Sequence, residues 1–101
     1  MDALEHPALD EIRIEAVLQA LADPMRLTIV RTLAERGTGV ACGSIELSIG
    51  KSTRTHHVRT LREAGVVHVR AEGTSRICTL RRDDLDALYP GLLGGVLAAE
   101  H

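Results

Sequence analysis

The chain has 101 residues, a formal net charge of −2 at pH 7, 45% hydrophobic residues and 1% aromatic residues. A chain of this length forms one domain, and its small core leaves apolar surface that a second copy would bury, so we expect an oligomer. Because Tyr89 is the single residue among Phe, Tyr and Trp, the chain lacks the stacking surfaces with which single-stranded nucleic-acid binders hold bases.

The basic residues gather in the middle of the chain. Residues 51–82 hold eight Lys and Arg against two acids, whereas residues 1–50 hold four against eight and residues 83–101 hold none against four. The net charge therefore hides a central segment of about +6 between two acidic segments of about −4 each. A concentrated basic surface of this kind is typical of contact with phosphates.

The sequence also bears on location and redox chemistry. The acidic N-terminus lacks the pattern of a signal peptide, and the longest mainly apolar run, residues 91–99, is too short to cross a bilayer, so we expect a soluble cytoplasmic protein without a membrane partner. The two cysteines, Cys42 and Cys78, have no CxxC spacing and predict neither a disulfide framework nor a zinc cluster. We interpret Cys42 as a small buried hydrophobic residue and Cys78 as a strand residue.

Two helices are predicted first. A helix over residues 10–22 ends at Asp23 and Pro24, which also start the next helix, since Asp is a good N-cap and Pro a good first helical residue. Apolar residues lie around most of the second helix, as in a helix buried centrally, and Gly37 and Gly39 end it.

A helix-turn-helix motif follows. A short helix over about residues 42–47, a tight turn at residues 48–50 and a helix from Lys51 or Ser52 to Ala64 have its arrangement. We expect the last of these to be the recognition helix.

The segment after Gly65 predicts a wing and then further helix. Residues 66–70 and 75–80 are β-prone, and the glycine between them supplies the turn of a two-stranded wing. Asp83 is expected to cap a last helical region, which is interrupted at residues 89–91.

The recognition helix has two faces. On a helical wheel Val58, Leu61 and, less centrally, His57 fall on the inward side, and the hydroxyl and basic residues fall on the side that would face a DNA groove. Small hydroxyl side chains permit close approach to DNA, and a long cation further along can reach the acceptors of guanine. In the wing, Arg76 is the expected cation for the adjacent minor groove. The predicted DNA-binding residues are Lys51, Ser52, Thr53, Arg54, Thr55, His56, Arg59, Arg70, Thr74 and Arg76.

Some of these residues have simpler interpretations. A charged helix face is usually only solvated surface, but its place between a helix-turn and a basic hairpin favours DNA contact. We interpret His57 as a structural histidine rather than a base reader. Arg54 occupies an inward position where an aliphatic residue is expected; extension toward phosphate and pairing with an acid such as Glu46 both remain open.

Two stretches carry a resemblance to a known family. Residues 21–30 read LADPMRLTIV, and residues 51–67 read KSTRTHHVRTLREAGVV. Over roughly residues 14–97 the chain closely resembles the ArsR/SmtB family of bacterial winged helix-turn-helix repressors, with Thr55 in place of a serine and Arg54 in place of the usual aliphatic residue. The resemblance implies a homodimer joined by the first and last helices, which binds an imperfect palindrome and releases it on binding metal or on thiol modification.

The family's sensing residues are matched poorly. Where the family has a Cys-Val-Cys run, residues 39–42 contain one cysteine, and the acids of residues 83–86 have no histidine partner before His101. His56 and His57 point about 100° apart on a helix, and transition metals need three or four converging ligands. We therefore predict no metal and no cofactor. Weak cross-dimer metal sites from Cys42 with Cys78 or from His6 with His101, and a redox switch based on Cys42, stay open as alternatives.

The sequence thus predicts a mainly α (α+β) winged helix-turn-helix fold of about five helices and a two-stranded wing, in a single domain over residues 1–101. Its parts are a helix-turn-helix at about 42–64, a wing at about 66–80, and dimerisation helices at about 10–22 and 83–99. The predicted function is sequence-specific binding of double-stranded DNA by a dimeric transcriptional regulator, expected to be a repressor, on a palindromic operator. The alternatives are a winged helix that acts through a protein co-regulator, or a metal- or thiol-responsive sensor with an atypical site. We do not expect an enzyme, because no Gly-rich phosphate loop, no nucleophile with a paired base and no spaced carboxylate pair is found.

Overall fold

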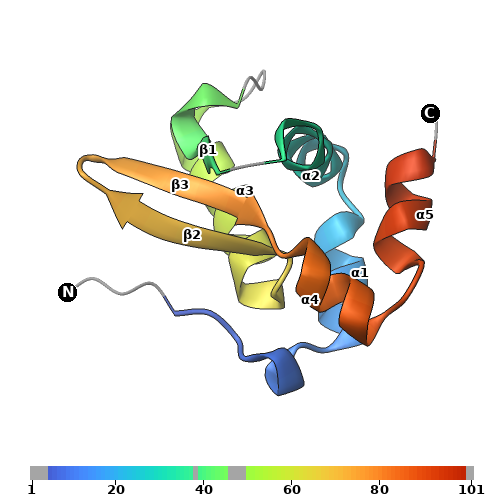
Figure 1. The fold of residues 1–101 in the computed structure, drawn as a ribbon. Helices are drawn as coiled ribbons and strands as arrows, with labels where there is room; N and C mark the ends of the chain where they lie inside the picture. The colour runs from blue at the N-terminus through green and yellow to red at the C-terminus, as the bar shows by residue number, and fades with distance from the viewer. Residues whose placement is uncertain (1–4, 38, 46–49, 100–101) are drawn as a thin grey trace.

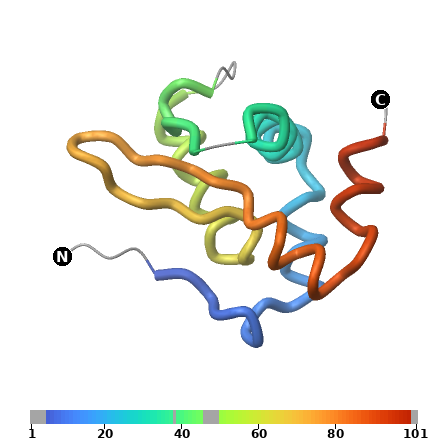
Figure 2. The backbone as a smooth tube through the Cα atoms, in the orientation of Figure 1, coloured from blue at the N-terminus to red at the C-terminus, as the bar shows by residue number. Residues whose placement is uncertain are grey.

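A computed structural model describes residues 5–37, 39–45 and 50–99. In chain order these form η1 (Leu9–Glu11), α1 (Ile14–Leu21), α2 (Pro24–Arg36), β1 (Val40–Ala41), η2 (Cys42–Ser44), α3 (Lys51–Ala64), β2 (Val67–Glu72), β3 (Ser75–Leu80), α4 (Arg82–Leu88) and α5 (Leu92–Ala98), where η denotes a 3-10 helix. The β2–β3 hairpin projects away from the helices, toward the left of Figure 1, and α3 lies behind it. The backbone trace of Figure 2 shows the same separation between the projecting hairpin and the helical part of the molecule.

Helix α2 begins with the N-cap and first helical residue that the sequence predicts. The Asp23 carboxylate accepts hydrogen bonds from the backbone N–H groups of Met25 (2.8 Å) and Arg26 (3.1 Å), and Pro24 is the first helical residue. Gly37, with a φ of 72°, ends the helix in the left-handed conformation that glycine adopts most easily. Both predicted boundaries of this helix are confirmed.

The first helix begins later than the sequence predicts. Leu9–Glu11 is a 3-10 turn, Ile12 is extended, and α1 starts only at Ile14. The Ile12 side chain is 8% exposed and packs against Gly65, where an added Cβ would lie 2.6 Å from the Cγ1 atom of Ile12. A helix continuous from residue 10 is therefore wrong, because packing against the end of α3 holds Ile12 outside helical geometry.

The sheet has a strand that the sequence pattern did not indicate. It is antiparallel in the order β1-β3-β2, with Val40 opposite Cys78 and Ala41 opposite Ile77. Two residues are too few to show a strand period in sequence. Where the sequence predicts the start of a helix over residues 42–47, Cys42–Ser44 form a 3-10 turn and Ile45 is extended. Residues 46–49 lie outside the described residues, and they include the rest of that predicted helix and most of the predicted tight turn at residues 48–50.

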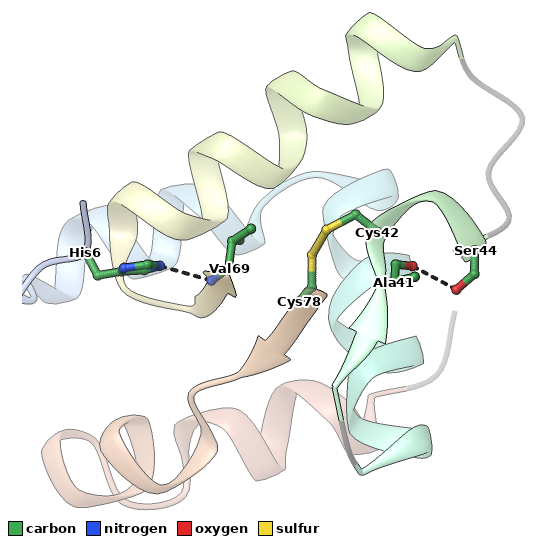
Figure 3. Close-up of a disulfide and its surroundings, with 6 residues drawn as sticks. All are labelled: His6, Ala41, Cys42, Ser44, Val69 and Cys78. Carbon is green, nitrogen blue, oxygen red and sulfur yellow. Dashed lines mark hydrogen bonds between the residues drawn. A yellow bond between two sulfur atoms is a disulfide. The ribbon is translucent and has the colours of Figure 1, made fainter. Parts of the chain in front are cut away.

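This third strand overturns the prediction for the cysteines. Cys42 and Cys78 form a disulfide, with their Cα atoms 5.8 Å apart, between the turn after β1 and the centre of β3 (Figure 3). Cys78 is a fully buried strand residue, as expected, whereas Cys42 is half-buried. The pairing of β1 with β3 puts the two residues side by side, so neither sulfur is the separate thiol that sequence reasoning assumed.

The C-terminal region contains the predicted interruption, with one difference at its start. α4 and α5 are separated at residues 89–91, where Gly91 has a φ of 87°. Helix α4 starts at Arg82, so Asp83 lies in the first turn and is not the cap. The chain is held at this point by Arg81, whose side chain donates to Asp84 (2.9 Å) and to the carbonyl of Pro7 (2.9 Å).

The core is aliphatic and joins the helices to the base of the wing. Its most completely buried large side chains come from α1, α2, α3, both wing strands and the last two helices; they include Val17, Ile29, Val30, Leu61, Val66, Val67, Leu85 and Leu93. Of the helices within residues 5–99 that the structure describes, none has the length and apolar character needed to cross a membrane.

Candidate nucleic-acid interface

Side chains on the inward face of α3 pack into the core and hold the helix in place. His57, Val58, Leu61 and Ala64 are buried on this face. Gly65 has a φ of 89°, and the N–H groups of Gly65 and Val66 donate to carbonyls of the last helical turn. The helix therefore ends sharply and leads directly into β2, which sets the angle between α3 and the wing.

His57 belongs to this support and not to the exposed face. It is 9% exposed, and its Nδ1 atom lies 3.1 Å from Nη1 of Arg26. Since a guanidinium group can only donate, Nδ1 must be the unprotonated acceptor. Arg26 also donates to the carbonyls of Ala20 (2.6 Å) and Gln19 (3.3 Å). The interpretation of His57 as a structural histidine is confirmed, because this network joins α3 to the junction of α1 and α2.

The outward face of α3 is open. Five of its residues line a shallow hollow, and all five are exposed: Lys51, Ser52, Thr55, His56 and Arg59. Thr53 is also exposed. Hydroxyl groups thus stand at the start of the helix and longer polar side chains stand one and two turns later, which is the order that groove contact requires.

A second hollow, called the cationic cleft below, separates α3 from η2 and the wing. Among its lining residues are five cations, four hydroxyl groups and Cys42; the cations are Lys51, Arg54, Arg59, Arg62 and Arg76, and the hydroxyl groups belong to Ser44, Thr55, Thr74 and Ser75. Within the described part of the chain, no acidic side chain lines it. Like charges gathered on one concave surface attract anions over a distance set by the salt concentration.

Two arginines of the cationic cleft, Arg54 and Arg62, differ in their contacts. Arg54 is half-buried, and its side chain makes no hydrogen bond or ion pair with any described residue, while Glu46, its suggested partner, lies outside the described residues. Arg62 donates to the carbonyl of Glu5 (2.6 Å). Arg62 and Ser44 were missed by sequence reasoning; the position of Arg62 three residues after Arg59 was the available signal, since residues at that spacing are neighbours on a helix surface.

Arg70 and Arg76 lie on opposite faces of the wing. In the hairpin register Val69 faces Cys78 and Ala71 faces Arg76, so these residues share the face toward α3. Arg70 pairs with Ile77 and points to the other face, because successive side chains of a strand alternate. It forms an ion pair with Glu72 (2.8 Å) and does not line the cationic cleft.

The residues considered for a metal site are dispersed. No group of three or more His, Cys, Asp and Glu side chains converges among the residues the structure describes. The rings of His56 and His57 are 5.8 Å apart and tilted by 48°. His6 stacks on His68 and accepts a hydrogen bond from the backbone of Val69 (3.0 Å), whereas His101 lies outside the described residues.

Several known proteins are similar to this chain. It is 37% identical over 86 residues to the uncharacterized HTH-type transcriptional regulator YceK of Bacillus subtilis. The matched region spans 83% of this chain and 85% of YceK. It is 42% identical over 59 residues to the uncharacterized HTH-type transcriptional regulator MJ1325 of Methanocaldococcus jannaschii. This matched region spans 57% of this chain and 66% of MJ1325. No protein-family model matches the chain.

Solved structures share the fold. An ArsR family transcriptional regulator, RHA00566, superposes with a TM-score of 0.68 at 19% identity and covers 81% of this chain and 90% of its own. The transcriptional repressor BigR of Xylella fastidiosa gives a TM-score of 0.63 at 27% identity over 86% of this chain and 88% of BigR. HlyU of Vibrio cholerae gives 0.60 at 26% identity over 74% of this chain and 89% of HlyU.

The fold and these likenesses define the class, which is a winged helix-turn-helix transcriptional regulator that binds DNA. The chain belongs to the family of HTH-type transcriptional regulators that includes YceK, and its fold is that of the ArsR/SmtB-type regulators, as the resemblance indicated. Regulators of this class are not enzymes, which confirms the prediction of no catalytic activity.

Proposed function

We propose that the chain acts as a homodimer on an imperfect palindromic operator, with α3 of each copy in a major groove and each wing beside it. The observation that carries this proposal is the continuity of the exposed α3 face with the cationic cleft. In this arrangement Ser52, Thr53 and Thr55 approach the backbone and base edges, while His56 and Arg59 read bases.

Four of the five remaining predicted residues contact phosphates. Lys51, Arg54, Thr74 and Arg76 line the cleft between α3 and the wing, where a DNA backbone would run. Arg70 is the one predicted residue on the opposite face of the hairpin. Arg70 can contact phosphate only if both faces of the hairpin tip lie inside a DNA groove.

A second copy of this chain is the partner that the apolar surface fits. Leu9, Ile14 and Leu18 are large hydrophobic residues that remain 44%, 39% and 49% exposed at the first helices. Leu92 and Val96 of α5 are only partly buried. Covering such side chains is favourable by about 25 cal/mol per Å² of apolar surface, which supports dimerisation through the first and last helices.

The mode of action follows the same comparisons. BigR is named a transcriptional repressor, and a dimer seated on its operator would block transcription, so we propose repression in the cytoplasm, where the DNA is. The relatives do not favour action through a protein partner instead of DNA.

Selection of bound fragments from random duplexes tests the proposal. The expected product is a palindrome whose half-sites lie about one helical turn apart, since a symmetric dimer reads successive major grooves. Insertion of about 5 bp between the half-sites should abolish tight binding, and insertion of about 10 bp should restore part of it. Selected sites without symmetry, or a monomer at binding concentrations in sedimentation, would contradict the proposal.

A further inference from the structure

The segment before α1, called the strap below (residues 5–13), is tied to both elements that frame the proposed DNA site. The carbonyl of Glu5 accepts a hydrogen bond from Nη1 of Arg62 in the last turn of α3 (2.6 Å). One residue later, Nε2 of His6 accepts a hydrogen bond from the backbone N–H of Val69 in β2 (3.0 Å; Figure 3). Two consecutive residues of the strap therefore bridge the recognition helix and the wing.

The rest of the strap is anchored to the helical part of the molecule. The carbonyl of Pro7 accepts a hydrogen bond from Arg81, just before α4 (2.9 Å). The carbonyl of Ile12 accepts a hydrogen bond from the hydroxyl group of Tyr89, just after α4 (3.2 Å). Neither anchor involves β2, so the strap is joined to the wing through His6.

The hydrogen bond of His6 lies on the free edge of the sheet. Strand β2 is at the edge in the order β1-β3-β2, and the N–H group of Val69 points to the strap instead of to a neighbouring strand. Val69 is 4% exposed, and a buried N–H group without a partner is costly. The His6 ring therefore satisfies this part of the edge while it holds the base of the wing.

This hydrogen bond requires a neutral His6 ring. Nε2 can accept only while it carries no proton, because both ring nitrogens of an imidazolium are donors. Histidine side chains take up a proton near pH 6.5. The His6 ring is also stacked on the His68 ring of β2, with 4.2 Å between the ring centres and 9° between the planes. Stacked imidazolium rings repel each other, so in acid His68 adds to the release of His6.

The other charged groups around the strap are largely engaged. They are Arg70 of β2, Arg62 of α3, Arg81 and Asp84 beside α4, and Glu5 and Glu11 of the strap itself. Arg70 and Arg81 form ion pairs with Glu72 (2.8 Å) and Asp84 (2.9 Å). The carboxylate of Glu11 accepts a hydrogen bond from the backbone of Ala8 (2.7 Å). The change in charge that accompanies a fall in pH near neutrality is therefore at the two histidines.

We infer that His6 is a positioning residue for DNA binding: its neutral ring holds the wing at a fixed angle to α3, and proton uptake releases the wing and weakens binding to the operator. The strap bonds to Arg62 and to Val69, on either side of Gly65, where the helix leads into the wing. The cationic cleft lies between these two elements, so its shape depends on their angle. The effect on DNA rests on the proposed function, whereas the strap contact does not.

Release of the strap has two opposite effects on the cationic cleft. It frees Arg62, which lines the cleft and can add one phosphate contact in each subunit. It also loosens the wing, which contributes Thr74, Ser75 and Arg76 to the same cleft. Because several contacts depend on the wing and one depends on Arg62, we expect weaker binding in acid.

The strap contact is tested without DNA by NMR of the full chain between about pH 8 and about pH 5. The amide signal of Val69 should shift with the same midpoint as the ring protons of His6. In His6→Gln a side-chain carbonyl supplies an acceptor that does not titrate, so the Val69 signal should stay constant. In His6→Leu the amide has no acceptor and should exchange with solvent faster than in wild type. A Val69 signal that ignores the titration of His6 would overturn the contact.

The positioning role is tested by titrating the selected operator at about pH 8 and about pH 5.5. The affinity of wild type, divided by that of His6→Gln at the same pH, should fall at least about 5-fold in acid. This ratio removes the effects of other groups that titrate on the protein or the DNA. His6→Leu should already show the lowered ratio at the higher pH. A constant ratio for wild type, or one that rises in acid, would overturn the role.

The matched control is His68→Gln, which removes the other ring of the stack and leaves the acceptor of His6 in place. It should keep the pH dependence of wild type. Loss of that dependence in His68→Gln but not in His6→Gln would overturn the assignment to His6. Circular dichroism checks that each variant is folded; if one is not, agreement between the wild-type midpoints of the Val69 signal and of operator affinity decides. A Val69 signal that follows His6, without operator binding at either pH, would instead refute the proposed function and leave the strap contact standing.

Discussion

Replacement of Arg76 by alanine is the most direct test of the proposed wing contact. Arg76 is exposed and lines the cationic cleft, and its side chain makes no hydrogen bond or ion pair with any described residue. Its charge is therefore free to neutralise a phosphate, and its removal should leave the fold intact because no described contact depends on it.

The expected magnitude follows from counterion release. Each phosphate neutralised on double-stranded DNA contributes about −0.9 to the slope of log K against log salt. In the proposed homodimer the substitution removes one cation from each of the two wings, so the slope for Arg76→Ala should be less steep than that of wild type by about 1.8. Over a fourfold rise in salt, the variant dimer should lose about 12-fold less affinity than the wild-type dimer does.

The assay is a fluorescence-anisotropy titration of the operator and of an unrelated duplex at several salt concentrations. Both duplexes should be affected by a similar factor, because phosphate contacts carry no sequence information. Arg70→Ala is the matched control, since Arg70 carries the same charge on the opposite face and is paired with Glu72 at 2.8 Å; it should change the slope by clearly less. A slope for Arg76→Ala equal to wild type, or a larger change for Arg70→Ala, would refute the placement of the wing.

Three further predictions concern base reading, dimerisation and stability. Arg59→Ala should reduce discrimination between the operator and single-base variants by about 1–3 kcal/mol at one position, and unchanged discrimination in a competition titration would exclude Arg59 as a base reader. Leu18→Glu puts a charge at a side chain that is 49% exposed and should shift the sedimentation profile toward monomer, whereas Gln19→Glu on the same helix should not; two identical profiles would argue against this interface. Asp23→Ala removes the cap of α2 and should lower the unfolding free energy at pH 7 by about 1 kcal/mol. The pKa of Asp23 is lowered, first by the hydrogen bond from the Arg26 backbone, so its contribution is present above the unfolded value of about 3.9 and is lost as pH falls through the folded value; the gap between wild type and variant in urea melts should close in acid, and a gap that widens there would contradict the assignment.

Local chemistry made most of the fold predictable. The Asp23-Pro24 pair, the left-handed glycines at residues 37 and 65 and the alternation along residues 67–80 each fix a boundary within a few residues of chain. Strong local signals of this kind allow an element to be recognised before its neighbours are known. The exposed face of α3 was predictable for the same reason, since helical periodicity separates Val58 and Leu61 from Thr55 and Arg59.

Features that depend on distant contacts were not predictable. Ile12 leaves the helical pattern because it packs against Gly65, more than fifty residues away. Strand β1 exists because its two residues pair with β3. Arg81, not Asp83, precedes α4, where its side chain is held by the Pro7 carbonyl and by Asp84.

The sequence by itself determined the class of fold, the recognition helix and the basic character of its surroundings, because capping, periodicity and charge are properties of neighbouring residues. Only the tertiary structure decided that Arg76 and Arg70 face opposite ways, that Arg62 joins the cationic cleft and that Cys42 is bonded to Cys78. The reason is geometric: strand register and the packing of α3 against the wing bring together residues that no short-range pattern connects.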